Sequence, residues 1–391
     1  MKKASYYQFL KGSYFDSTFD LISNWPSTSL TRLSIVQDPL PQPQEGTHKP
    51  FAQPIVFFSL TPLTRLSLSP ATEKVTHIRL RVPSRHLVRF IAPQSLDILE
   101  YRYPFPNATF MDLSTSSIQS FDDLELLLNF VGGGRLRHLI LDNTGLCGGS
   151  ARDWERLGRT CALAGVKHSR EHEKALKFWT QDGTMSANQN GINPGPPGNA
   201  QDRPSRRGRR GLATATISLR DRPTPPIVST HLPPQHPVTP HKPTKIRICP
   251  SPPRLLTLCI SLPLSPGDNS AEDIKTLEGN ALSDFARGWS DGIRQLRSIW
   301  TRLKQSQSNG VRVFRFDVEG KNRSREDITL LDGLVQIYGS NNDEFWEELD
   351  TLELPVLCFS GPREYSVGNE WPGHPNKCGH RISDDVWGDY L

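Results

Sequence analysis

Residues 136–146, with the sequence LRHLILDNTGL, constrain the fold of this chain more than any other segment. Leu136, Leu139 and Leu141 are separated by three residues and then by two, and Leu146 ends the stretch. Since successive side chains of a strand alternate between its two faces, Leu139 and Leu141 share one face. The spacing predicts a short strand with one face buried in a stack of similar strands and the other face available for binding.

The same six-residue core recurs along the first half of the chain. Its starts lie at residues 30, 63, 75, 96, 108 and 136, which gives intervals of 33, 12, 21, 12 and 28 residues. Leucine-rich repeats hold to about 20–29 residues, and any half-buried strand has some apolar residues at these spacings. The number of matches nevertheless favours an α/β fold with a short, irregular leucine-rich-repeat-like solenoid over residues 1–180. The other cores are Leu30, Leu33, Ile35; Leu63, Leu66, Leu68; Val75, Ile78, Leu80; Leu96, Leu99, Tyr101; and Ala108, Met111, Leu113.

Helix-start signals lie between and after these cores. Ser120 with Asp123, and Ser150 with Asp153, have the spacing of a capping residue and an acidic residue in the first helical turn. The second helix contains Trp154, a large apolar side chain. We expect this helix to close the open end of the stack, where leucines would otherwise be exposed.

A proline-rich, basic segment follows at residues 181–267. Residues 201–266 contain 14 of the 33 prolines, with 11 basic and 2 acidic side chains. Because proline lacks the backbone N–H that helices and sheets require, we predict a disordered linker. Within it, residues 211–220 alternate like a strand, and residues 254–264 are apolar enough to pack on other elements. A translated intron would have a similar composition.

The sequence RPSRRGRRG, residues 203–211, is a dense positive cluster formed by Arg203, Arg206, Arg207, Arg209 and Arg210. A solvated linker is its simplest interpretation, and a nuclear import signal is the next. Nucleic-acid binding is a third, although no aromatic residue is interleaved to stack on bases.

The acidic C-terminal part predicts a small α+β region over residues 268–360 and a disordered tail over residues 361–391. Strands are expected at 311–318 and 354–361, with a helix running through Leu330, Leu331, Leu334 and Ile337 between them. A longer helix is predicted at 281–305, because its apolar residues follow each other at intervals of three and four. These are Phe285, Trp289, Ile293, Leu296, Trp300 and Leu303. The stripe could form a coiled coil, but packing within its own domain is favoured.

Cysteine and histidine come together near the C-terminus, where His374, Cys378 and His380 lie within seven residues. Imidazole and thiolate suit zinc, but a structural site needs four ligands, and no second Cys/His pair lies nearby in sequence. We therefore expect no metal and no cofactor, and interpret the six cysteines as reduced, buried residues. The sequence has no catalytic motif, which favours a protein that is not an enzyme.

No run of 18 apolar residues and no apolar leader segment occurs, so we expect no membrane partner and a cytoplasmic or nuclear location.

Residues 111–179 resemble the terminal repeats and closing helices of basidiomycete fungal proteins of the leucine-rich-repeat, F-box-like (RNI-like) type, which have no established activity. Residues 208–220 and 355–364 resemble segments of the same proteins. The resemblance implies a binding solenoid that supplies substrate recognition to a ubiquitin-ligase scaffold. The F-box of that family, roughly L-P-x-E followed by apolar residues, is not recognisable, so this is either an N-terminally short product or a free-standing solenoid.

Together these features predict a non-enzymatic protein–protein interaction module. Its binding surface would be the outward face of the strands, which is weakly basic and therefore suits acidic partners. The alternative is a nuclear, nucleic-acid-associated protein that uses Arg206, Arg207, Arg209 and Arg210. The residues predicted for the protein-binding surface are His77, Arg79, Arg81, Arg102 and His138.

Overall fold

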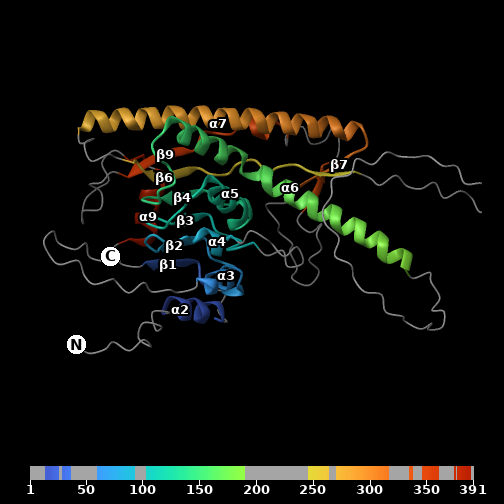
Figure 1. Ribbon diagram of the computed structural model, residues 1–391, viewed down its shortest axis with the longest axis horizontal. Helices are drawn as coiled ribbons and strands as arrows, with labels where there is room; N and C mark the ends of the chain where they lie inside the picture. Colours follow the sequence, from blue (N-terminus) through green and yellow to red (C-terminus); the bar gives the residue numbers. More distant parts are fainter. Residues whose placement is uncertain are drawn as a thin grey trace, which may run out of the picture. The chain divides into compact units, whose positions relative to one another are not determined.

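A parallel sheet of six strands organises the fold in the computed structural model (Figure 1). The structure describes residues 14–25, 29–36, 60–92, 103–189, 245–263, 270–316, 334–337, 346–360, 374–375 and 377–388. The strands are β1 (Arg32–Val36), β2 (His77–Arg81), β3 (Phe110–Asp112), β4 (His138–Leu141), β6 (Thr257–Ser261) and β9 (Val356–Ser360), adjacent in that order. Each successive strand is added at the same edge. The predicted α/β class is confirmed.

One apolar residue from each strand lies at the same level of the sheet. The register pairs Leu33 with Ile78, and the same level continues through the next four strands. All six side chains are buried in one hydrophobic core, so this face of the sheet is the core face. The remaining members of this row are Met111, Leu139, Leu258 and Leu357.

Four of the predicted repeat cores lie at strands, and one is a helix. The cores that start at residues 30, 75, 108 and 136 include β1, β2, β3 and β4. The core that starts at residue 63 was wrongly expected to be a strand, because it lies in α3 (Thr61–Ser67). Pro62 lies in the first turn of α3, where its missing N–H costs nothing, and Leu63 and Leu66 are buried on one helical face. The core that starts at residue 96 lies outside the described residues.

One helix precedes β1 and others lie between and after the next strands, and two of them begin at the predicted capping residues. The elements are α2 (Tyr14–Ser23), α4 (Val88–Ile91), α5 (Phe121–Phe130) and α6 (Ala151–Gln189), with short 3-10 turns η2 (Pro70–Thr72) and η3 (Val131–Gly134). The Asp123 N–H donates to Ser120 Oγ at the start of α5, at 3.3 Å. The Asp153 N–H donates to Ser150 Oγ at 3.2 Å, before α6. Both predicted helix starts are therefore confirmed.

The C-terminal half does not form the separate region that we expected. The described parts of residues 1–178 and of residues 245–391 belong to one compact unit. The segment predicted as a disordered linker contributes β5 (Ile246–Ile248) and β6, because TLCIS supplies apolar and β-branched residues that pair with β4. The tail predicted to be disordered contains α9 (Gly379–Trp387).

A second sheet joins β5, β7 (Arg312–Phe316) and β8 (Leu334–Ile337). Strand β7 pairs in parallel with β5 and antiparallel with β8, and η5 (Glu348–Asp350) precedes β9. The helix that we expected through Ile337 is thus a strand at residues 334–337. Three apolar side chains among four residues fit either period, and pairing with β7 decides between them.

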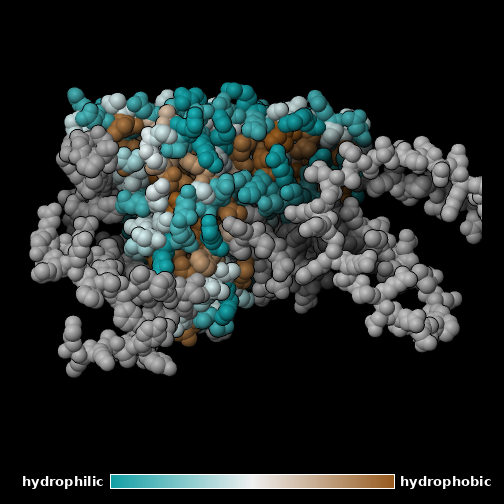
Figure 2. All heavy atoms as spheres, viewed as in Figure 1, coloured by the Kyte–Doolittle hydropathy of each residue, from teal (hydrophilic) through white to brown (hydrophobic). Residues whose placement is uncertain are grey.

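Helix α7 (Ala271–Ser308) contains the predicted apolar stripe, of which Phe285, Trp289, Ile293, Leu296 and Trp300 are buried. Its outward side, along the top of Figure 2, is mostly hydrophilic, with apolar side chains gathered below it. Helices α6 and α7 approach closely at glycines: a methyl group at Gly158 would collide with the carbonyl of Phe285, and one at Gly288 with that of Glu155. The stripe packs within the chain, which we favoured over a coiled coil, but it packs on α6 and in the main core and not within a separate C-terminal region.

Within the described part of the chain, no helix combines the length and the apolar character needed to cross a membrane.

Candidate metal centre

The face of the six-stranded sheet opposite the core, here called the second face, is covered by helix α9. A small buried cluster lies between them, formed by Phe110, Ile140, Cys259, Cys358 and Cys378, with Ile382 packed against it. At the other end of α9, the guanidinium of Arg32 in β1 donates to the Val386 carbonyl at 2.8 Å. The helix therefore has contacts from the β9 side of the sheet to the β1 side.

Gly379 lets the first turn of α9 lie flat on the sheet. A methyl group at this position would be 2.9 Å from Cys259 Sγ and 3.3 Å from the side chains of Ile140 and Thr257. Any larger residue would push the helix start away from β4 and β6.

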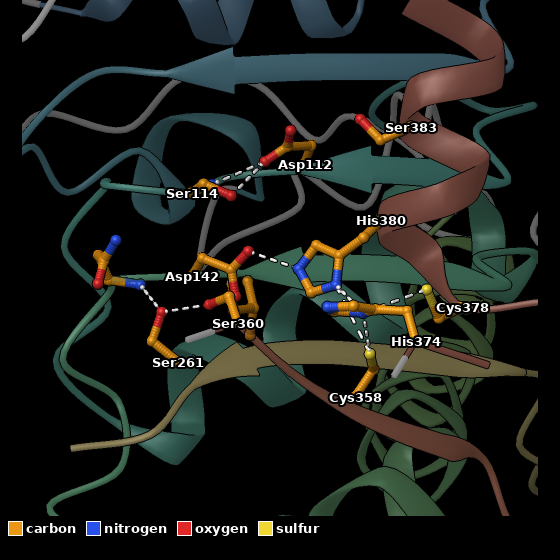
Figure 3. Close-up of polar contacts among 12 residues, drawn as sticks. Asp112, Ser114, Asp142, Ser261, Cys358, Ser360, His374, Cys378, His380 and Ser383 are labelled. Atoms are coloured by element: carbon orange, nitrogen blue, oxygen red, sulfur yellow. Dashed lines mark hydrogen bonds and ion pairs between the residues drawn. The ribbon is translucent and has the colours of Figure 1, made fainter. Parts of the chain in front are cut away.

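Four buried side chains converge where α9 begins (Figure 3). Cys358 is in the middle of β9, His374 precedes α9, Cys378 is the N-cap residue of α9, and His380 lies in its first turn. Their exposed fractions are 5%, 7%, 0% and 4% respectively. One nitrogen or sulfur atom of each lies within 4.8 Å of the corresponding atom of every other.

The closest distances in this group involve the two imidazole rings. His374 Nδ1 lies 2.8 Å from Cys358 Sγ, 3.6 Å from Cys378 Sγ and 3.3 Å from His380 Nδ1. His380 Nδ1 is also 3.6 Å from Cys358 Sγ. Both δ-nitrogens and both sulfurs therefore face a common centre.

A polar chain holds the far side of His380. Its Nε2 lies 2.7 Å from Oδ2 of Asp142, the residue that follows β4. Ser360 Oγ donates to Asp142 Oδ1 at 2.7 Å. Burial lowers the pKa of His380, but its hydrogen bonds to Asp142 and to the neighbouring cysteines outweigh that effect and raise the pKa overall. Figure 3 shows His380 between the carboxylate of Asp142 on one side and the sulfurs on the other.

The residues predicted as a basic binding surface lie partly on this second face, but they do not form an open positive patch. Arg79 is only 7% exposed, and its guanidinium lies 4.7 Å from the ring centre of Trp387 in α9. Arg81 Nη2 pairs with the fully buried Asp112 at 2.7 Å. Burial, and next the charge of Arg81, lower the pKa of Arg79 to about 10. This part of the prediction needs correction, because Asp112 offsets one of these two positive charges and α9 covers the face.

Two other predicted surface residues lie near each other, on the two strands that flank β3. His77 and His138 are partly buried at the starts of β2 and β4, and both flank Phe110. Burial, with smaller contributions from Arg137 and His77, lowers the pKa of His138 to about 4. Arg102 and the cluster Arg206, Arg207, Arg209 and Arg210 lie outside the described residues.

The sequence showed three members of the cluster but missed Cys358 and Asp142. Our reason for expecting no metal site was the lack of a fourth ligand, and the fold supplies it from β9, twenty residues before Cys378. No local spacing signals this arrangement, because it depends on β9 pairing beside β6.

Comparisons with family models, with curated proteins and with solved structures gave no match, so the resemblance to the leucine-rich-repeat, F-box-like proteins stays a prediction.

Proposed function

We propose that this protein is a non-enzymatic protein–protein interaction module that binds acidic segments on the second face of its sheet. The observation that carries the proposal is the helix that lies there: α9 contains Asp384, Asp385 and Trp387. The carboxylate of Asp384 acts on the charge of Arg79, and Trp387 stacks over its guanidinium. A surface that holds an acidic, tryptophan-bearing helix of its own chain has the chemistry to hold a similar helix of a partner.

The strand arrangement supports a binding scaffold of the repeat type. Strands that follow each other in chain order, with leucines and similar residues at one level, are what an irregular leucine-rich-repeat-like solenoid would produce. Such solenoids bind partners on the strand face. If the chain acts in a ubiquitin ligase, we propose that this face recognises the substrate.

A fluorescent peptide with the sequence of residues 379–388 tests the proposal. The full chain with Trp387→Ala, which loosens its own α9, should bind this peptide at least severalfold more tightly than the wild-type chain does. Adding Arg32→Glu should weaken binding, because Arg32 donates to the backbone of α9. The matched control is Arg89→Glu, which makes the same charge change at an exposed residue of α4. Fluorescence anisotropy measures all four affinities.

Two results would contradict the proposal. One is equal binding of a peptide in which both aspartates are replaced by asparagine. The other is an equal loss of affinity in Arg32→Glu and Arg89→Glu, which would mean that only net charge matters.

A further inference from the structure

We propose that Cys358, His374, Cys378 and His380 bind one structural Zn²⁺ ion that fastens α9 to the second face of the sheet. The inference goes beyond the proposed function and does not depend on it, because it concerns a ligand of the chain itself.

The distances agree with a tetrahedral ion. Zinc lies about 2.0–2.1 Å from histidine nitrogen and about 2.3 Å from cysteine sulfur, so tetrahedral ligands are about 3.3 Å (N–N), about 3.6 Å (N–S) and about 3.8 Å (S–S) apart. The two δ-nitrogens are 3.3 Å apart, and two of the nitrogen–sulfur distances are 3.6 Å. Cys358 Sγ and His374 Nδ1 are closer, at 2.8 Å. Binding of an ion would need to lengthen this distance by less than about 1 Å.

The donor set selects the metal. Two thiolates with two imidazoles in a tetrahedral arrangement suit Zn²⁺, whereas Mg²⁺ and Ca²⁺ require oxygen ligands. Protein ligands would fill all four positions in a site that is almost closed to solvent, which is the arrangement of a structural zinc rather than a catalytic one.

The surroundings of His380 also fit a metal ligand. A histidine that binds a metal through one ring nitrogen usually donates its other N–H to a carboxylate. The Asp142 carboxylate accepts the hydrogen bond from Nε2 of His380, and Nδ1 of the same ring is directed at the two sulfurs and at His374. The hydrogen bond from Ser360 Oγ in turn holds Asp142.

Cys259 distinguishes this site from a general cluster of thiols. It pairs with Cys358 in the register of β6 and β9, is fully buried and interacts with His380, yet it is not among the four residues whose donor atoms all converge. Replacing Cys259 should therefore leave the metal in place, whereas replacing Cys358 or Cys378 should release it.

Zinc would connect β9 to the first turn of α9, through Cys358 on one side and Cys378 and His380 on the other. Since the rest of α9 contacts the second face, removal of zinc should free the helix and expose that face. In the peptide assay described above, a chelator should then increase binding to the wild-type chain. This expectation alone rests on the proposed binding function.

Metal analysis of the purified full-length chain, with Zn²⁺ and Co²⁺ as the probes, tests the proposal. We expect one zinc per chain and visible absorption of tetrahedral cobalt with thiolate ligands. Cys358→Ser and Cys378→Ser should each lose at least tenfold in zinc affinity, and Cys259→Ser should keep the wild-type affinity. X-ray absorption at the zinc edge of the wild-type chain needs no variant and should show two sulfur and two nitrogen ligands.

Several outcomes would overturn the assignment. They are a chain without zinc, a different bound metal, a Cys358–Cys378 disulfide in a non-reducing peptide map, or a loss of zinc in Cys259→Ser as large as in Cys358→Ser. None of these results depends on a partner, so failure of the zinc site and failure of the binding proposal are separate observations.

Discussion

Asp142 decides which nitrogen of His380 faces the cysteines. Its carboxylate lies at Nε2 and holds the proton of that nitrogen, so Nδ1 is the nitrogen that can give up its proton to bind a metal. Asp142→Ala should therefore lower zinc affinity by roughly 10–100-fold, the usual effect of losing such a partner. Asp142→Asn, whose amide oxygen can still accept from Nε2, should lose less. Competition with a chelator measures the affinity.

The stability of the metal-free protein separates this positioning role from a general loss of structure. If Asp142→Ala and Asp142→Asn weaken zinc binding equally, the orientation argument is wrong. The same conclusion follows if the melting temperature of the metal-free chain falls in Asp142→Ala but zinc affinity does not change.

Sequence reasoning at the level of single residues succeeded where the signal was local. His374, Cys378 and His380 were recognised as possible ligands because they lie within seven residues of each other. Cys358 and Asp142 come from two different strands, and only the pairing of β4, β6 and β9 brings them to α9. A linear pattern contains no information on that pairing.

At the level of elements, the contact between α6 and α7 depends on glycine. Gly288 is buried where the carbonyl of Glu155 approaches, whereas Gly279, on the same helix, has open space around it. Gly279→Ala should stabilise the chain by up to about 1 kcal/mol, because alanine has the higher helix propensity. Gly288→Ala should instead destabilise it, by about 1–3 kcal/mol for overpacking. Denaturant unfolding compares the two; equal shifts of the same sign would mean that the helices do not touch there.

The elements were predictable where capping and periodicity agreed. The helix starts at Ser120 and Ser150 had both signals. Helix α7 was predicted from its apolar stripe alone, and it begins ten residues before the predicted start, after the cap residue Ser270. The pattern failed at α3, where Leu63 and Leu66 satisfy a strand template and a helical face equally well. It failed again at β8, because four residues are too few to distinguish the two periods.

At the level of the molecule, proline content misled the prediction. We expected residues 181–267 to separate two folded parts, yet β6 adds to the sheet beside β4 and is followed there by β9. The strand itself contains no proline, although Pro250, Pro252, Pro253 and Pro263 flank it. Composition averaged over a long window hides a five-residue strand whose partners are 119 and 99 residues away along the chain.

The stability of the whole molecule should fall in mild acid through a buried histidine. His168 on α6 stacks on Phe316 of β7, with ring centres 4.4 Å apart, and its Nε2 is 3.1 Å from the Tyr103 hydroxyl. Burial, and next the nearby His172, lower its pKa from 6.5 to about 3. Between these two pH values, His168 is protonated in the unfolded chain but stays neutral in the folded chain. This contribution to stability is therefore complete above pH 6.5 and is lost by roughly 1.4 kcal/mol for each pH unit below it.

His168→Gln removes that proton-binding group and retains an acceptor for the Tyr103 hydroxyl. The variant will lose some packing against Phe316, so its melting temperature at pH 7.5 should be lower than that of the wild-type chain. Between pH 6.5 and 4.5, however, its melting temperature should fall less steeply. His86→Gln, at a partly exposed histidine, should keep the wild-type slope. Parallel pH profiles for His168→Gln and the wild-type chain would show that His168 is protonated in the folded state, and hence that the packing of α6 against β7 admits water.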